Sequence, residues 1–200
     1  MYVNAAMNSR GRKPGEYPSA GPLAHLINIW KCGAPSIDIF APDIYDTGYK
    51  GWVAKYKRAD NPFFTPEVKC DANSGAKAYY TFGETDAISF SPFALDEAND
   101  KVRKNLQQSY KLLKQLSHIL LQQQGKGNNW GLLFDQEDKE RIIEDGDLVM
   151  TCRHFFTLPW DARATDGSKW PEGGGLIQKI GKNEYLIAGN GIVVVFQSKT

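Results

Sequence analysis

The sequence predicts an α/β region followed by an all-β region, and two observations support this fold class. Up to about residue 125, one pattern occurs four times: an apolar strand-like run, a loop, and a segment with apolar residues at helical spacing. After Gln124, short apolar runs alternate with turns rich in glycine and asparagine, which is typical of antiparallel β structure. We therefore expect two domains, residues 1–125 and 126–200.

The four predicted strands of the first region are short apolar runs bounded by turn residues. In the third, two aromatic residues and a threonine follow a turn signal, and Pro66 forbids a helix. Its last residue, Glu67, is a carboxylate at the strand end that faces ligands in parallel α/β proteins. A solvated glutamate paired with Lys69 is the alternative. The expected strands are 2–6, 36–45, 63–67 and 87–90.

Each of these strands precedes a segment whose apolar residues fall on one helical face. Pro22 opens the first predicted helix after a loop from Asn8 to Gly21, and the residues from Asp96 to Asp100 cap the last. The third helix is expected to end near Gly83. The apolar faces are Leu23, Leu26, Ile27 and Trp30; Tyr49, Trp52, Val53 and Tyr56; Ala76, Tyr79, Tyr80 and Phe82; and Val102, Leu106, Tyr110, Leu113, Leu116 and Leu120.

The region from Trp130 to Thr200 is expected to form a sandwich or a small packed sheet of antiparallel strands. Gly181 to Asn183 and Gly189 to Gly191 have hairpin-turn chemistry, because glycine and asparagine accept positive φ. Gly173 to Gly175 lacks the strand-to-helix context of a phosphate loop and is expected to be a flexible turn. The predicted strands are 132–134, 147–156, 175–180, 184–188 and 192–197.

Composition limits the possible partners of the chain. The 24 Lys and Arg residues nearly balance the 23 Asp and Glu residues, so the net charge of +1 gives no electrostatic basis for binding nucleic acid. No apolar run approaches the roughly 18 residues of a membrane helix, and the N-terminus lacks the layout of a signal peptide. The three cysteines are too widely spaced to propose a metal site or a disulfide framework. We expect no cofactor and no bound metal.

Five segments of the sequence carry a resemblance to a known family: residues 2–5, 11–19, 34–45, 60–67 and 86–93. In this order, they resemble segments of a group of bacterial β-galactosidase-like glycoside hydrolases in or close to glycoside hydrolase family 35. These enzymes have a (β/α)8 barrel followed by a β-rich C-terminal domain. The resemblance implies that this chain holds the C-terminal half of a TIM-type (β/α)8 barrel, with four βα units equivalent to strands five to eight, and then a small antiparallel β domain. It spans nearly the whole chain and is looser from Trp130 onward.

The resemblance also implies an activity, retaining hydrolysis of terminal β-linked galactose or a similar sugar. Glu67 matches the glutamate nucleophile at the end of the seventh barrel strand, which attacks the anomeric carbon and forms a covalent glycosyl-enzyme. Tyr45 matches a tyrosine that holds this nucleophile ionised and aimed, and Asp43 is a possible ligand of sugar hydroxyls. The other candidate substrate contacts are Asn4, which lines the site, and Phe90 and Phe93, which stack on a sugar ring.

The general acid/base of these relatives is a glutamate at the end of strand four, a position upstream of Met1. Retaining chemistry needs two carboxyl groups about 5–5.5 Å apart, so this chain alone is expected to be inactive. The first and fourth strands would also be open edges, which predicts a homo-oligomer that covers them. Relatives of this kind are often exported, which makes a periplasmic or extracellular location plausible. Nothing matches four other acids to the acid/base role: Glu16, Glu84, Asp86 and Asp96.

A different class of function stays open at this point. The β domain is, in this alternative, a non-catalytic carbohydrate-binding or structural module attached to an incomplete barrel. Trp130, Trp160 and Trp170 are candidates for a sugar platform, although their scatter along the sequence favours a packing role.

Overall fold

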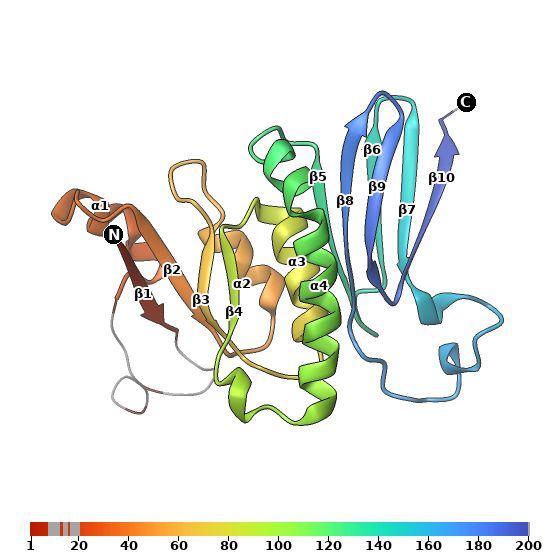
Figure 1. The fold of residues 1–200 in the computed structure, drawn as a ribbon, viewed down its shortest axis with the longest axis horizontal. Coiled ribbons are helices and arrows are strands. Elements are labelled where there is room, and N and C mark those ends of the chain that lie inside the picture. The colour runs from red at the N-terminus through yellow and green to blue at the C-terminus, as the bar shows by residue number, and fades with distance from the viewer. Residues whose placement is uncertain (8–12, 14–15, 17–20, 200) are drawn as a thin grey trace. The chain divides into compact units, whose positions relative to one another are not determined.

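A computed structural model describes residues 1–7, 13, 16 and 21–199 of the chain. Most of the predicted loop from Asn8 to Gly21 therefore lies outside the described residues. The same holds for most of segment 11–19, one of those that carry the family resemblance. The fold is mixed α/β, with a four-stranded parallel sheet and two three-stranded antiparallel sheets (Figure 1). This confirms the predicted order of an α/β region followed by antiparallel β structure.

The helices and strands occur in the order that the sequence pattern predicts, with one additional strand. The strands are β1 (Tyr2–Ala6), β2 (Ile39–Ile44), β3 (Phe64–Val68), β4 (Ser89–Pro92), β5 (Asn129–Phe134), β6 (Glu140–Asp145), β7 (Leu148–His154), β8 (Gly173–Gly181), β9 (Glu184–Asn190) and β10 (Ile192–Ser198). The α-helices are α1 (Ile27–Gly33), α2 (Tyr49–Tyr56), α3 (Ser74–Thr85) and α4 (Asp100–Gln123), and short 3-10 turns are η1 (Ala24–Leu26), η2 (Leu95–Glu97), η3 (Phe155–Thr157) and η4 (Ala162–Ala164).

The chain forms two compact units, and each of them is made of two separate stretches of sequence. Unit 1 comprises Met1–Ser74 and Thr85–Arg103, and unit 2 comprises Gly75–Glu84 and Lys104–Thr200. Nearly all of α3 and most of α4 therefore group with the antiparallel strands. The division into domains 1–125 and 126–200 stays a prediction.

Unit 1 contains the parallel sheet, in the order β1-β2-β3-β4, with β1 and β4 at its edges. The central strand β2 is buried without interruption from Phe40 to Ile44, as is typical of strands in parallel sheets. Its register aligns Asp43 with Glu67 of β3 and with Ala6 of β1. The carboxyl ends of these strands therefore meet at one edge of the sheet, where parallel α/β proteins bind ligands.

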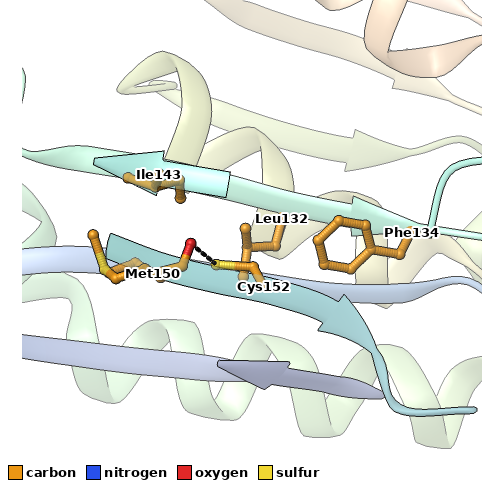
Figure 2. Close-up of a cluster of buried hydrophobic side chains, with 6 residues drawn as sticks. Leu132, Phe134, Ile143, Met150 and Cys152 are labelled. Atoms are coloured by element: carbon orange, nitrogen blue, oxygen red, sulfur yellow. Dashed lines mark hydrogen bonds between the residues drawn. The ribbon is translucent and has the colours of Figure 1, made fainter. Parts of the chain in front are cut away.

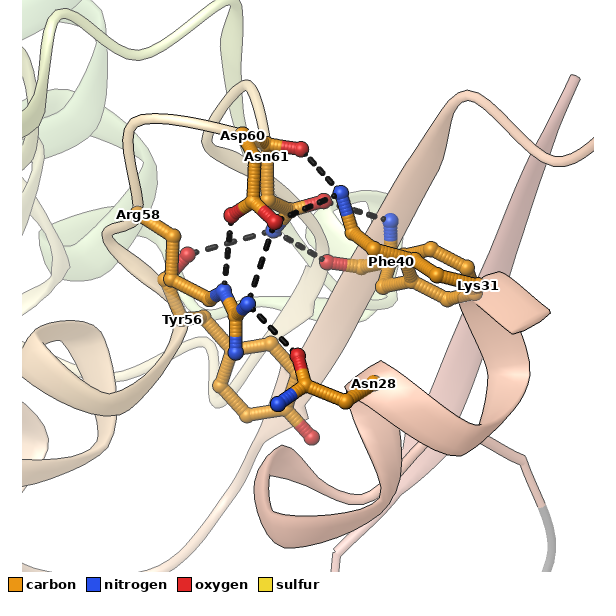
Figure 3. Close-up of polar contacts among 7 residues, drawn as sticks. All are labelled: Asn28, Lys31, Phe40, Tyr56, Arg58, Asp60 and Asn61. Atoms are coloured by element: carbon orange, nitrogen blue, oxygen red, sulfur yellow. Dashed lines mark hydrogen bonds and ion pairs between the residues drawn. The ribbon is translucent and has the colours of Figure 1, made fainter. Parts of the chain in front are cut away.

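The amino end of β2 is tied to the end of α2 by one buried side chain, Asn61, which is 2% exposed (Figure 3). Its amide oxygen accepts from the backbone N–H of Phe40 at 2.9 Å, and its Nδ2 donates to the carbonyls of Phe40 at 3.0 Å and Tyr56 at 3.1 Å. These three bonds pair backbone groups that burial would otherwise leave unsatisfied.

An exposed ionic network lies beside Asn61 (Figure 3). Arg58 holds Asp60 through a two-point contact, 2.8 Å from Nε and 3.1 Å from Nη2, and Lys31 also pairs with Asp60. Hydrogen bonds from Arg58 and then Lys31 lower the pKa of the Asp60 carboxyl well below its usual range. Because these groups are exposed, solvent screens the network, and its contribution to stability is small.

Unit 2 is a sandwich of two antiparallel sheets with helices on one outer face. One sheet has the order β5-β8-β9 and the other β10-β7-β6. A buried apolar cluster between them draws side chains from both sheets, including Leu132, Phe134 and Ile177 from one, and Met150 and Cys152 from the other (Figure 2). The sandwich is therefore held chiefly by apolar burial between facing strands.

Close approach of α3 to the β5-β8-β9 sheet explains three glycines. A Cβ at Gly174 would lie 2.3 Å from the carbonyl oxygen of Ala76, and one at Gly131 would lie 2.4 Å from that of Tyr80. A Cβ at Gly83 would lie 2.8 Å from the carbonyl of Trp130. Glycine is required at these positions because any larger residue would push the helix away from the sheet.

These glycines correct two sequence-based predictions. Gly173 to Gly175 is not a flexible turn but the buried beginning of β8, whose glycines admit neighbouring backbone and side chains. Gly83 does not end α3, which continues to Thr85 and stops at Asp86, a residue in the left-handed conformation with φ of 53°. In both cases glycine serves tertiary packing, which a local pattern does not reveal.

Two further predictions about the β region were wrong. Strand β6 was missed because its sequence is largely charged, and only Ile143 of its residues is buried in the core. The segment Gly189 to Gly191 is not a hairpin turn, since β9 and β10 belong to different sheets. Its positive-φ glycines carry the chain from one sheet to the other.

We expect Asn61→Ala to reduce the free energy of unfolding by about 2–4 kcal/mol, because three buried backbone groups lose their partner. Urea denaturation measures the change. The matched control is Asn28→Ala, which removes an exposed acceptor of Arg58 in the same network and should cost at most about 0.5 kcal/mol. Equal losses in the two variants would contradict the role assigned to Asn61.

Candidate active site

The carboxyl edge of the parallel sheet brings together the side chains of Tyr45 and Glu67. Tyr45 directly follows β2, and its hydroxyl donates a hydrogen bond of 2.7 Å to Oε2 of Glu67 on β3. Desolvation, and then this hydrogen bond, raise the pKa of the Tyr45 phenol above its usual range. The phenol therefore stays protonated at neutral pH and donates to the Glu67 carboxylate.

A second polar pair, Asn4 and Asp43, lies on the adjoining strands β1 and β2. Nδ2 of Asn4 donates to Oδ2 of Asp43 at 2.7 Å, and Asp43 is only 5% exposed. Burial raises the pKa of the Asp43 carboxyl to about 6; the Asn4 hydrogen bond opposes this shift, and the charge of Glu67 adds to it. Asp43 and Glu67 are aligned in the register of β2 and β3, so the two pairs form one site.

The local chain around Glu67 departs from regular strand geometry. The pairing of β3 with β4 shifts register between Thr65 and Val68, the stretch that includes Pro66 and Glu67. Proline has no N–H to give to a neighbouring strand, so an irregularity is expected there. Bulges of this kind re-aim side chains next to active sites. The sequence shows the signal in Pro66, although on its own Pro66 predicted only that the segment is not helical.

The two candidate aromatic residues differ in their surroundings. Phe93, which follows β4, is 53% exposed, and its ring centre lies 6.0 Å from that of Tyr45 in an edge-to-face arrangement. Phe90 is buried, and its ring lies edge-to-face with Tyr49 of α2. The structure thus brings Phe93, and not Phe90, to the exposed side of Tyr45.

Two of the other acids have structural partners, and a third lies at a helix end. Glu84 pairs with Arg141 at 2.7 Å and accepts from the backbone N–H of Gly131, which anchors α3 to β5 and β6 within unit 2. Glu16 accepts a hydrogen bond from the backbone N–H of Lys13. Asp86 terminates α3. None of these contacts involves Glu67.

In the part of the chain that the structure describes, no group of three or more His, Cys, Asp or Glu side chains is placed to hold a metal ion. The described residues of unit 1 also form an open pocket of about 480 Å³ beside η1 and α2. None of the candidate site residues lines it; its lining residues are Leu23, Ala24, His25, Trp52 and Lys55.

The three tryptophans of the β region lie in different environments. Trp170 is buried and stacks on the ring of His154 at 4.8 Å, while Trp130 packs against the sandwich core. Both ring nitrogens of His154 are used, one toward Pro171 and the other accepting from Phe156, so this histidine has a packing role. Trp160 alone of the three tryptophans is highly exposed, at 76%.

Comparison with protein-family models gives a match for the C-terminal part of the chain. Residues 106–200 match a family model described as "Domain of unknown function (DUF5597)". No curated protein matches the chain. The matched range covers most of α4 and the sandwich, and it does not include the residues of the candidate active site. Among the described residues, no helix is both long enough and apolar enough to cross a membrane.

The burial of Asp43 makes stability depend on pH. Its pKa is raised from 3.8 in the unfolded reference to about 6 in the folded chain, so the folded state holds the proton more tightly. Its contribution to stability is full below about pH 4 and is lost as pH rises through about 6.

We therefore expect the stability of the wild-type chain, relative to Asp43→Asn, to fall by about 1–3 kcal/mol between about pH 4 and pH 7.5, since one unit of pKa shift equals about 1.4 kcal/mol. Urea denaturation of both proteins at each pH measures this difference, in which titration of the other groups cancels. A difference that does not change with pH would show that Asp43 ionises normally.

Proposed function

We propose that this chain is part of a retaining glycoside hydrolase that cleaves terminal β-linked galactose or a similar sugar, with Glu67 as the nucleophile. The observation that supports it best is the 2.7 Å hydrogen bond from Tyr45 to Glu67 at the carboxyl edge of a parallel sheet. A phenol that donates to one carboxylate oxygen fixes the orientation of the carboxylate and leaves the other oxygen available to attack. The resemblance to family 35-like enzymes supplies the substrate class.

In the proposed reaction, Oε1 of Glu67 attacks the anomeric carbon of the sugar. The bond to the leaving oxygen breaks, its electron pair stays on that oxygen, and Glu67 becomes esterified to the sugar. Water then attacks the same carbon, gives one proton to a second carboxylate, which had been the acid, and releases the Glu67 carboxylate. Tyr45 holds Oε2 throughout, while Asp43, Asn4 and Phe93 contact the sugar, the last through its exposed ring.

A second carboxyl group must protonate the leaving oxygen, and we propose that it comes from outside this chain. The parallel sheet would then be the C-terminal half of a TIM-type (β/α)8 barrel, with β1 to β4 as strands five to eight. The sheet order supports this, because β1 and β4 are edge strands whose backbones are ready to pair with further strands. Exposed Tyr2 on β1 and Ile88 before β4 would be covered by such an addition.

When this chain is on its own, a homo-oligomer covers these edges in place of those further strands, and this is part of the proposal. We expect light scattering to give a mass above the 22.4 kDa of one chain. Replacing two exposed apolar residues near the edges, as in Tyr2→Lys with Ile88→Lys, should lower that mass, because buried lysines disfavour the contact. A soluble wild-type monomer at high concentration would contradict the oligomer.

Non-catalytic carbohydrate binding by the sandwich is the second candidate function. Trp160 supports it, since a well-held loop exposes this indole. Trp170 Nε1 donates to the carbonyl of Arg163 at 2.8 Å, and the guanidinium of Arg163 lies 3.7 Å from the ring centre of Phe156. An exposed tryptophan on an ordered loop is a usual stacking partner for a sugar ring. Glycan binding that Trp160→Ala abolishes and Glu67→Gln leaves intact would favour this function.

The enzyme proposal is tested by trapping the covalent intermediate. Dinitrophenyl 2-fluoro-galactoside has a leaving group that departs as a stable phenolate, so its reaction with Glu67 does not need the outside acid. We expect mass spectrometry to find one 2-fluoro-galactosyl group per chain, on the peptide that contains Glu67. Ordinary alkyl β-galactosides, which need protonation, should show no turnover.

Glu67→Gln is the control that removes the nucleophile while keeping the side-chain shape, and it should not be labelled. Tyr45→Phe should be labelled about tenfold to a hundredfold more slowly, because the carboxylate loses one positioning hydrogen bond. Label on another residue, or equal labelling of Glu67→Gln, would refute the assignment of Glu67.

A further inference from the structure

The two oxygens of the Asp43 carboxyl group have different surroundings. Oδ2 accepts the hydrogen bond from Asn4, whereas Oδ1 is buried and has no hydrogen-bond partner among the described residues. A charged carboxylate with one buried oxygen and no donor to it is strongly disfavoured. A neutral carboxyl group avoids most of this penalty, and its proton would reside on Oδ1, the oxygen that Asn4 leaves unoccupied.

The neighbours of Asp43 also disfavour a charge on it. The groups that interact with it electrostatically are Glu67 on β3, Tyr45 just beyond the end of β2, and Tyr56 on α2. The tyrosines are uncharged near neutral pH, and the pKa of Tyr56 is itself raised to about 12, first by burial and then by Asp43. Asn4 on β1 contributes an uncharged amide. Glu67 is therefore the one charged member of this set, and its charge is negative.

We propose that Asp43 sets the charge of the candidate active site: in acidic solution it is neutral and leaves Glu67 as the single anion, and near neutral pH it ionises and adds a second anion beside Glu67. The site changes from one negative charge to two without a change of fold, since Asn4 can donate to Oδ2 in both states.

This inference deepens the proposed function, on which it rests for the identity of the ligand. Ligands that are cationic at the sugar ring, such as iminosugars, should gain affinity when the second anion appears. Positive charge also develops on the sugar ring in the transition state of glycoside hydrolysis. The pH range in which the enzyme is active would then depend on the ionisation of Asp43 as well as on that of the acid/base carboxyl group from outside this chain.

The titration of Asp43 can be tested without any ligand. In the full chain, the carbon-13 signal of the Asp43 carboxyl group, assigned by its loss in Asp43→Asn, should titrate near pH 6. Glu67→Gln should move the midpoint down by about half a pH unit, the effect of one charge several ångströms away. Asn4→Ala should move it up, because the charged form loses a hydrogen bond. A wild-type midpoint near 4, or no response to Glu67→Gln, would overturn the proposal.

The effect on ligands is tested with a galactose-configured iminosugar by calorimetry at about pH 5 and pH 7.5. The ratio of the affinities of wild type and Asp43→Asn cancels the protonation of the ligand itself. We expect this ratio to rise about fivefold with pH, since one more charge at about 4 Å contributes about 1 kcal/mol in water. A constant ratio would overturn the proposal. If neither protein binds the iminosugar at either pH, the proposed function fails, and the carbon-13 titration still decides the charge state of Asp43.

Discussion

The candidate active site depends on the parallel register between β2 and β3. That register aligns Asp43 with Glu67 and allows Tyr45, just beyond the end of β2, to reach Oε2 of Glu67. A shift of one residue would turn the carboxylates to opposite faces of the sheet. The buried amide of Asn61 holds the other end of β2 by pairing the backbone of Phe40. The hydrogen bonds of Asn61 thus hold one end of β2, and the other end of the same strand carries Asp43 of the candidate site.

The two units of the protein are stabilised in different ways. In unit 1, buried polar groups such as Asn61 and Asp43 accompany an apolar sheet, and each has a hydrogen-bond partner on a neighbouring element of the fold. In unit 2, stability comes from apolar burial between two sheets and from backbone contact of α3 at Gly131 and Gly174. The residues that match the family of unknown function, 106–200, lie in the second of these environments.

Local sequence patterns predicted the alternation of strands and helices and the antiparallel region, because both depend on the spacing of apolar residues. These patterns failed where contacts between distant parts of the chain determine the local structure. Strand β6 is charged because only one of its faces is covered, and Gly83 lies inside α3 because a neighbouring strand requires it. At the candidate site, Glu67 was predicted from its place at a strand end and Tyr45 from the resemblance, while the hydrogen bond between them depends on the fold. The unpartnered oxygen of Asp43 depends on burial, which no spacing of residues encodes.

The chain crosses between its two compact units more than once. Residues 75–84 of α3 group with the sandwich, residues 85–103 return to the parallel sheet, and the chain then enters the sandwich again. Cutting the backbone at any single peptide bond therefore cannot yield both units intact. A fragment that begins near residue 104 would lack α3 and expose the glycine surface of β5 and β8. The unit that contains the β region is thus built from two separate stretches of sequence, residues 75–84 and 104–200.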